Sequence, residues 1–238
     1  MAGGHYVALS GMRTRLDELD RLASDLANVG TAGYKAERTG HRNVPRPVFD
    51  DALESAIDSS LGARRLDARA GAIEPTGRAM DVAIEGAGFL AVDTPAGPRY
   101  TRNGHLSRTP DGQLITADGA VVRGVDGPIT VGEGSLSVDS DGSVLSNGAV
   151  VGKLAIVQFG DPGALVRESG ALLRTDETPT PVPTPTIRTG SLEQSNVSVV
   201  DRVAELTAVN RSFQALQKAV SVLMNDVDGR AIETFGRR

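Results

Sequence analysis

Regularly spaced glycines in the middle of the chain constrain its fold more than any other feature of the sequence. The runs between these glycines are too short to form stable helices. The Asn-Gly and Asp-Gly steps favour primed two-residue hairpin turns, because both central residues of such a turn tolerate positive φ. We therefore expect an antiparallel sheet or small barrel of short strands. The glycines are Gly97, Gly104, Gly112, Gly119 and Gly127, seven or eight residues apart.

Three further segments continue this β-rich pattern. Residues 153–159 give the strongest single strand signal, which predicts a strand in the middle of the sheet. Residues 139–142, Asp-Ser-Asp-Gly, resemble part of a calcium loop but lack a glutamate at the right spacing, so they predict a hairpin turn. Residues 178–186 alternate proline with threonine or valine. They predict an extended strap that leads out of the β-rich part.

The N-terminal segment predicts an amphipathic helix that ends at a turn. Asn28 and Gly30 predict its end, because both residue types adopt the left-handed conformation that closes a helix. Gly33 adds a second permissive position just before Tyr34 and Lys35, and an ordinary helix end is the alternative interpretation. The apolar or small residues are spaced alternately by three and four, which predicts one stripe facing a partner. They are Leu9, Met12, Leu16, Leu19, Ala23 and Leu26.

The C-terminal segment predicts a second amphipathic helix of about four heptads. Arg202 is the one misfit in its apolar seam, and Val203 and Met224 flank that seam. The apolar face is therefore wider than one partner helix requires, which predicts contact with more than one helix and favours assembly. The seam residues are Val199, Leu206, Val209, Phe213, Leu216, Val220, Leu223 and Val227.

Together these patterns predict an α+β chain. Its N- and C-terminal heptad helices flank an all-β, hairpin-rich middle. Residues 1–35 and 191–238 make up the predicted helical assembly domain. Residues 76–190 make up the predicted β-rich domain, which ends in the strap. Residues 36–75 are interpreted as a connecting segment, with a short helical pattern at 50–61.

Composition and motifs weigh against several classes of function. The 238-residue chain has a net charge of −5, which argues against nucleic-acid binding. It has no Cys, which excludes disulfides and cysteine-ligated metals, and its 3% aromatic residues are few for a small-molecule pocket. No nucleotide-binding loop or serine nucleophile motif is present, and His5, His41 and His105 are isolated from one another. We therefore expect no catalytic residues, metal site, cofactor or small-molecule substrate.

The N-terminus lacks the basic region and continuous apolar run of a cleaved signal peptide. No apolar stretch approaches the roughly 20 residues that span a bilayer. The sequence thus predicts a protein that is not membrane-inserted, and any route out of the cytoplasm must be one without a cleaved signal.

Three separated motifs span nearly the whole chain. Residues 26–35 read Leu-Ala-Asn-Val-Gly-Thr-Ala-Gly-Tyr-Lys. Residues 76–89 are followed by Tyr-Thr-Arg-Asn-Gly at 100–104 and Asp-Gly-Gln-Leu at 111–114. Residues 190–197 read Gly-Ser-Leu-Glu-Gln-Ser-Asn-Val. In this order the motifs resemble those of the flagellar axial proteins, and within that family the basal-body rod proteins of the FlgF and FlgG type.

The resemblance implies a structural subunit of the bacterial flagellar basal-body rod. Such a subunit polymerises with itself and with other rod or hook subunits through its terminal helices, which form a coiled-coil-like inner domain around an all-β, hairpin-rich outer domain. The resemblance also implies export by the flagellar type III apparatus without a cleaved signal peptide, and a place in the periplasmic rod. The implied joint between polymer core and outer domain consists of Asn28, Gly30, Gly33, Tyr34 and Lys35.

Within this family the short chain favours a proximal-rod, FlgF-like subunit, and a distal-rod FlgG-like or hook-type subunit is the alternative. Ala32 stands where the family often has proline, His105 stands where serine is frequent, and residues 42–61 match no part of the pattern. The alternative from another functional class is an extracellular ligand-binding β module on a helical stalk. The scarcity of aromatic residues weakens it.

Overall fold

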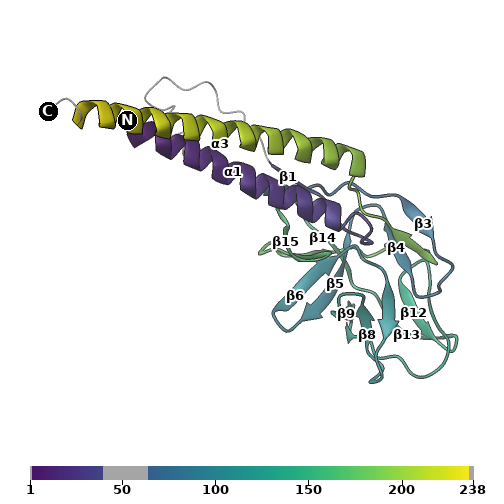
Figure 1. Cartoon of the computed structure of the whole chain (residues 1–238). Helices are drawn as coiled ribbons and strands as arrows, with labels where there is room; N and C mark the ends of the chain where they lie inside the picture. The colour runs from purple at the N-terminus through teal and green to yellow at the C-terminus, as the bar shows by residue number, and fades with distance from the viewer. Residues whose placement is uncertain (1, 40–63, 236–238) are drawn as a thin grey trace. The chain divides into compact units, whose positions relative to one another are not determined.

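The computed structural model describes residues 2–39 and 64–235, which fall into two compact units (Figure 1). The helical unit contains the terminal segments, up to Leu26 and from Ser198 onward. The β unit contains residues 27–38 and 65–197. The class is therefore α+β, as predicted. The helical pattern expected at 50–61 lies outside the described residues.

The described residues of the helical unit include two long helices. They are α1 (Ala2–Ala27) and α3 (Val199–Phe235). α1 ends directly before Asn28, at the predicted boundary. α3 begins after Ser198, whose hydroxyl accepts a hydrogen bond from the backbone N–H of Asp201 at 3.4 Å and so caps the helix.

The largest sheet of the β unit has ten strands, seven of which follow the order β15-β16-β6-β5-β9-β8-β7. β10 pairs with β9, and β14 pairs with both β5 and β17, all antiparallel. The strands are β5 (Phe89–Thr94), β6 (Gly97–Thr101), β7 (Leu106–Arg108), β8 (Leu114–Thr116), β9 (Val121–Gly124), β10 (Gly127–Pro128), β14 (Ile156–Gln158), β15 (Val166–Ser169), β16 (Leu172–Arg174) and β17 (Thr180–Pro181). A 3-10 turn, η2, covers Pro162–Ala164.

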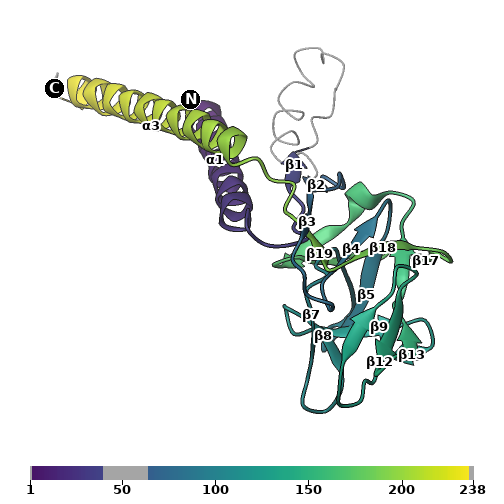
Figure 2. The same cartoon turned by 90° about the vertical axis from the view of Figure 1, so that its right-hand side faces the viewer.

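Smaller sheets complete the β unit. β4 pairs with β18 and β3 pairs with β19, so the segments that open and close the β-rich part lie side by side (Figure 2). A three-stranded sheet has the order β11-β12-β13, and β1 pairs with β2. The strands are β1 (Glu37–Thr39), β2 (Arg64–Leu66), β3 (Ile73–Pro75), β4 (Val82–Glu85), β11 (Leu136–Val138), β12 (Ser143–Ser146), β13 (Ala149–Lys153), β18 (Thr186–Thr189) and β19 (Ser191–Glu193).

Most of the regularly spaced glycines lie in hairpin turns, as predicted. Those that join consecutive antiparallel strands are Gly97, Gly112, Gly119 and Gly127. The prediction of a hairpin at Asn103-Gly104 is wrong, because the flanking strands β6 and β7 lie at separate places in the sheet. The carbonyl of Gly104 instead accepts a hydrogen bond from the N–H of Val82 at 3.0 Å.

The hairpins mostly use another turn type than the primed turns expected. Among the described residues, only Asn147 and Gly148 form a consecutive pair with positive φ, at 52° and 80°, which the primed turn requires. At Gly112, Gly119 and Gly142 the glycine N–H bonds to the carbonyl three residues earlier, at 2.9–3.0 Å. This is a type I turn whose last residue alone has positive φ, so the preceding Asp keeps an ordinary conformation.

Two extended segments differ from their predictions. The strand expected at 153–159 is interrupted: β13 ends at Lys153, Leu154 forms an isolated bridge with Gly124, and β14 follows. β14 does lie inside the sheet, since it pairs on both sides. The proline-rich segment 178–186 was expected to lead out of the β-rich part, but it also contributes a strand to the large sheet. This strand, β17, pairs with β14 at the edge of the sheet, where Pro181 can lie because an edge strand does not need every backbone N–H for pairing.

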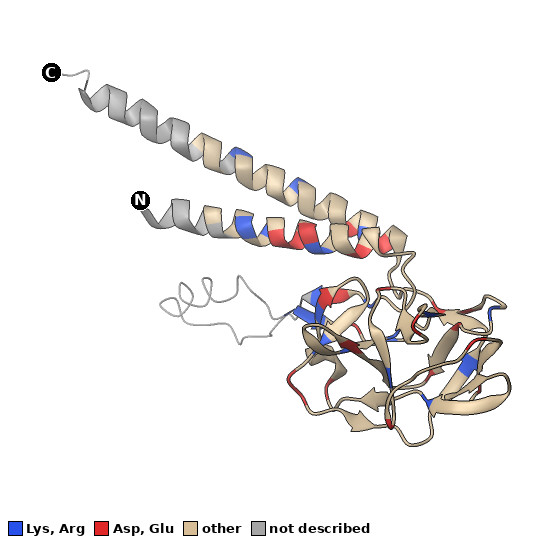
Figure 3. Ribbon diagram, turned by 90° about the horizontal axis from the view of Figure 1, so that it is seen from below, with Lys and Arg blue, Asp and Glu red and all other residues tan. Residues whose placement is uncertain are grey.

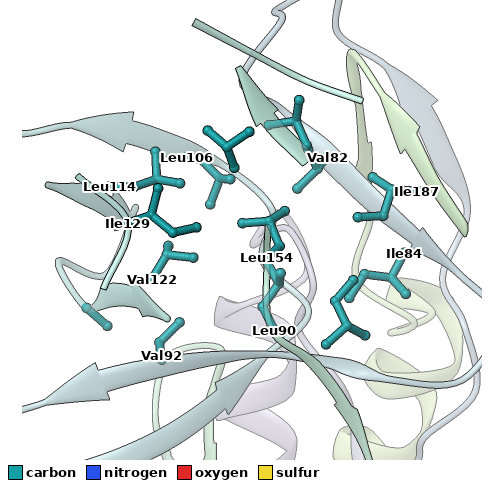
Figure 4. Close-up of a cluster of buried hydrophobic side chains, with 14 of the residues drawn as sticks. Val82, Ile84, Leu90, Val92, Leu106, Leu114, Val122, Ile129, Leu154 and Ile187 are labelled. Atoms are coloured by element: carbon teal, nitrogen blue, oxygen red, sulfur yellow. The ribbon is translucent and has the colours of Figure 1, made fainter. Parts of the chain in front are cut away.

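The core of the β unit has two apolar clusters separated by β5. Leu90 and Val92 of β5 belong to the larger cluster, and Phe89 and Ala91 to the smaller one. Successive side chains of a strand point to opposite faces, so β5 is buried on both sides. Members of the larger cluster labelled in Figure 4 are Val82, Ile84, Leu90, Val92, Leu106, Leu114, Val122, Ile129, Leu154 and Ile187.

Candidate functional site: the joint and the terminal helices

The chain leaves α1 through two successive turns. The N–H of Thr31 donates to the carbonyl of Asn28 at 3.0 Å, and the Thr31 hydroxyl donates to Asn28 Oδ1 at 3.2 Å. The N–H of Tyr34 then donates to the carbonyl of Thr31 at 3.2 Å. Asn28 directly follows the last residue of α1, and Thr31 lies within the turn beyond it. These bonds direct residues 33–36 into the interior of the β unit.

Gly33 occupies a position that requires the absence of a side chain. Its φ is +69°, and a Cβ atom there would lie 2.2 Å from the carbonyl carbon of Arg102 and 2.2 Å from the nitrogen of Asn103. Its N–H donates to the carbonyl of Glu193 at 2.7 Å. Gly30, by contrast, is exposed and has open space around its Cβ position. Of the two glycines predicted for the joint, Gly33 is therefore the constrained one.

Tyr34 is fully buried in the β unit. The guanidinium of Arg167 lies 4.1 Å from its ring centroid, a favourable cation–π contact. Arg167 also donates to the backbone carbonyl of Lys35 and lies 3.6 Å from Glu37 Oε1. The guanidinium of Arg167 thus covers one face of the Tyr34 ring, and Glu37 compensates its charge. Tyr34 also packs beside Val197 in a small apolar cluster.

Lys35 and Glu193 form an ion pair whose side chains are each 1% exposed. Lys35 Nζ donates to Glu193 Oε1 and to the carbonyl of Arg69, the latter at 2.8 Å. The N–H of Gly71 also donates to Glu193 Oε1, at 2.9 Å. Burial lowers the pKa of the Lys35 ammonium below its usual value, against the opposing attraction of Glu193. The charge of Lys35 therefore depends on its partner.

Arg102 directly follows the last residue of β6 and also contacts this ion pair. Its Nη1 donates to Glu193 Oε2 at 3.0 Å and to the carbonyl of Ile84 at 3.1 Å. Its Nη2 donates to the carbonyl of Gly86 at 2.6 Å. We call Lys35, Arg102 and Glu193 the joint cluster. One carboxylate in it accepts from two cations, each of which is also bonded to backbone carbonyls.

Asn196 lies beside the joint cluster. It connects the two chain crossings of the β unit, which are the segment that enters the unit after α1 and the segment that leaves it before α3. Its Oδ1 accepts from the N–H of Ala36 at 2.7 Å, and its own N–H donates to the carbonyl of Tyr34 at 3.3 Å. Its Nδ2 donates to the carbonyls of Asp67 and Arg69 at 2.8 and 3.0 Å. The chain therefore enters and leaves the β unit at one place.

The predicted stripe of α1 is only partly covered within one chain. Leu9 is 59% exposed and Leu16 is 47% exposed, and both lie on the predicted stripe. The remaining large residues of the stripe are half-buried: Met12, Leu19 and Leu26. Charged residues occupy much of the rest of α1 (Figure 3).

Two contacts between α1 and α3 involve other positions of α1. A Cβ atom on Gly11 would lie 3.7 Å from Leu216 Cδ1, and Asp25 Oδ2 lies 3.4 Å from Arg202 Nε. Both residues of α1 lie outside the predicted stripe. The helix pair within one chain therefore leaves the exposed part of that stripe available for other contacts.

The seam of α3 is buried to different degrees. Val209 is buried, whereas Val199 is 45% exposed. The half-buried members are Leu206, Phe213, Leu216 and Val220. The side chains of Leu223 and Val227 lie outside the description, although the backbone of α3 extends beyond them.

Sequence reasoning selected Tyr34 and Lys35 but not their partners. Arg102 lies within the motif at 100–104, and Glu193 and Asn196 lie within the motif at 190–197. The available signal was that the segments 26–35, 100–104 and 190–197 each carry a single charged residue, which is Lys35, Arg102 and Glu193 in turn. Only the fold shows that these charges meet.

In the part of the chain that the structure describes, no helix is long and apolar enough to cross a bilayer. No group of three or more His, Asp or Glu side chains within residues 2–39 and 64–235 is arranged to hold a metal ion.

Two protein families match separate parts of the chain. Residues 83–146 match the family described as the flagellar hook protein FlgE/F/G D1 domain. Residues 188–225 match the family described as the flagellar basal body rod FlgEFG protein C-terminal region. The first match covers much of the large sheet, and the second covers the Glu193 motif and the first part of α3.

Whole-chain relatives agree with these matches. The chain is 31% identical to the flagellar basal-body rod protein FlgF of Rhizobium meliloti (strain 1021), over 99% of each chain. It is 34% identical to FlgF of Escherichia coli (strain K12), over 95% of each chain. It is 28% identical to the rod protein FlgG of Bacillus subtilis (strain 168), over 91% of this chain and 93% of that one. The chain therefore belongs to the family of flagellar basal-body rod proteins.

Proposed function

We propose that this chain is a proximal-rod, FlgF-like structural subunit that assembles through its two terminal helices. The observation that carries this proposal is the joint cluster, Lys35, Arg102 and Glu193. It brings together the three motifs that the chain shares with rod proteins, and it holds both chain crossings of the β unit. Such a joint suits a subunit whose terminal segments belong to a polymer and whose middle does not.

Exposed apolar residues on both helices support assembly. Leu9 and Leu16 of α1 are about half exposed, and Val200 and Val222 of α3 are 79% and 59% exposed. Covering such surface is favourable by about 25 cal/mol per Å². We propose that neighbouring copies cover it in a coiled-coil-like inner domain formed by α1 and α3. The predicted terminal segments 1–35 and 191–238 extend beyond these helices, because residues 28–35 and 191–197 lie in the β unit.

The proposed partners are further copies of this chain and other rod or hook subunits. The proposed place is the periplasmic rod of the basal body, reached through the flagellar export apparatus without a cleaved signal. Residues 36–75 would connect the inner domain to the outer β-rich domain, residues 76–190. The names and full-length similarity of the FlgF relatives support these assignments.

Replacing Leu16 by Asp is expected to abolish assembly without unfolding the subunit. Leu16 is 47% exposed, so a charge there should change the free energy of unfolding by less than about 0.5 kcal/mol. In a packed interface the same charge costs several kcal/mol. Cells that carry only the variant should lack swimming motility and intact rods in electron micrographs. Arg13→Asp, on the exposed polar side of α1, is the control. Normal rods containing Leu16→Asp would refute an interface at this position.

Deleting residues 200–238 is expected to leave a folded β unit that cannot assemble. The deletion keeps Glu193 and Asn196, which complete the joint. A second deletion, of residues 190–238, removes both and should unfold or strongly destabilise the β unit. Circular dichroism and urea unfolding of the two truncated chains distinguish these outcomes. Equal stability of the two would show that the joint does not support the β fold.

A further inference from the structure

α1 and α3 meet through a buried charge pair as well as through apolar contacts. Asp25 of α1 is fully buried, and its Oδ2 lies 3.5 Å from Nη1 of Arg21 on the same helix. The same oxygen lies 3.4 Å from Nε of Arg202 on α3, whose side chain is 12% exposed. Arg202 Nη1 also contacts Glu205 Oε2 at 2.5 Å. One carboxylate is thus shared between a cation of its own helix and a cation of the other.

Arg202 is the residue that interrupts the apolar seam of α3. It stands one heptad before Val209 and two heptads before Leu216. Leu216 lies opposite Gly11, and Gly11 stands two heptads before Asp25 on α1. The contacts Gly11–Leu216 and Asp25–Arg202 therefore connect one row of α1 to one row of α3. Because the two pairs run in opposite chain directions, they define a single antiparallel register (Figure 1).

Apolar contacts alone do not distinguish this register from its neighbours. A shift of one heptad in one direction would place Val209 opposite Gly11, again an apolar residue against glycine. Arg202 would then be level with Glu18, which already pairs with Arg15 at 2.7 Å, and Asp25 would be level with a residue before α3 begins. A shift in the other direction would place Asp25 opposite the apolar Val209. Either shift removes the cation of α3 from a buried carboxylate.

A buried ion pair contributes little net stability, because desolvation offsets attraction, but a buried charge without its partner is costly. Single polar residues in helical seams are known to select register in this way. We propose that Asp25 and Arg202 select the register of the α1–α3 pair, and that the misfit in the heptad pattern is a specificity determinant. This inference concerns one chain and does not depend on the proposed assembly.

The register can be measured by disulfide cross-linking, since the chain has no native Cys. Gly11→Cys with Leu216→Cys reports the native register, because a Cβ on Gly11 lies close to Leu216. Gly11→Cys with Val209→Cys reports a shift of one heptad, and Gly11→Cys with Leu223→Cys reports the opposite shift. The purified full chain is oxidised at high dilution, and the intramolecular product is quantified by gel mobility and mass spectrometry.

Three changes are compared in each cysteine background. Arg202→Glu should lower the native cross-link by about tenfold, because it places two carboxylates together. Inverting all four charges, by Arg21→Glu, Asp25→Arg, Arg202→Glu and Glu205→Arg, should restore most of the native product. Replacing Asp25 and Arg202 together by Leu should keep the helices paired but add shifted cross-links to at least about a tenth of the total. Arg211→Glu, an exposed change on α3, is the control and should have no effect.

The outcome for the double leucine variant decides between two explanations of register. The backbone ties between residues 33–36 and 193–196 are the competing restraint. Exclusive native cross-linking in the leucine variant would overturn the proposal and assign register to those ties alone. Failure of the charge-inverted variant to recover the native product would overturn it as well. Appearance of shifted products together with that recovery would support it.

Discussion

Replacing Glu193 by Gln is expected to cost about 3–5 kcal/mol of unfolding free energy, a large share of the stability of most proteins of this size. The substitution keeps the shape of the side chain but leaves Lys35 and Arg102 as two buried cations, 2% and 5% exposed. Removing one partner of a buried ion pair leaves a charge that neither water nor protein neutralises. Urea unfolding of the full chain, followed by circular dichroism, measures the loss.

Two further measurements separate charge from other effects of that substitution. Glu74→Gln makes the same change at an exposed position on β3, opposite Leu192 of β19, and should alter stability by less than about 0.5 kcal/mol.

Burial already lowers the pKa of Lys35 below 10.5, and loss of Glu193 removes an opposing contribution. Between the folded and the unfolded pKa of Lys35, the unfolded chain binds more protons, so stability rises with pH. The variant should therefore regain part of its stability as the pH approaches 10.5. A loss below about 1 kcal/mol at neutral pH would contradict the assigned role of the cluster.

Replacing Gly33 by Ala is expected to cost more than about 2 kcal/mol. An L-residue at positive φ is strained by roughly 1–2 kcal/mol. Here φ is +69°, and the new methyl group would also lie 2.2 Å from backbone atoms of Arg102 and Asn103, which cannot rotate away. Overpacking of a filled site adds about 1–3 kcal/mol. Thermal and urea unfolding of the full chain provide the comparison.

Gly30→Ala is the matched control for this prediction. Gly30 lies three residues earlier in the same motif, has open space at its Cβ position and has no positive φ. Alanine should be neutral there, or stabilising by about 0.4–1 kcal/mol through a less flexible unfolded chain. Equal losses of stability at the two glycines would contradict the prediction. They would show that the loss at Gly33 does not arise from its φ angle or from its contacts with Arg102 and Asn103.

Local signals in the sequence predicted the elements of this fold better than their pairing. The end of α1 at Asn28 and most glycine hairpins follow from residues a few positions apart, whose conformational preferences act locally. Asn103-Gly104 carries the same hairpin signal, yet the carbonyl of Gly104 accepts a hydrogen bond from the N–H of Val82. Val82 begins β4, a strand that is distant in sequence. Tertiary pairing overrides local preference at such positions.

The joint shows the same limit at the functional site. Sequence resemblance singled out Lys35, but nothing local indicates that its partner is Glu193, separated from it by 158 positions. Arg202 was visible as a break in a heptad pattern, and only the position of Asp25 on α1 gives that break a reason. Charges whose partners lie far away in sequence look like surface residues until the fold is known.

The closing of the β unit on itself has a consequence for how the protein acquires its structure. Lys35 and Glu193 must meet across nearly the entire β-rich part of the chain, and contacts of such separation form late, because a long loop must be closed first. During synthesis, or during any passage of the chain in extended form, the segment after α1 lacks its contacts with Glu193 and Asn196 until the last strand is available. A chain that ends before Glu193 therefore lacks the contacts that hold the segment after α1 beside the segment before α3.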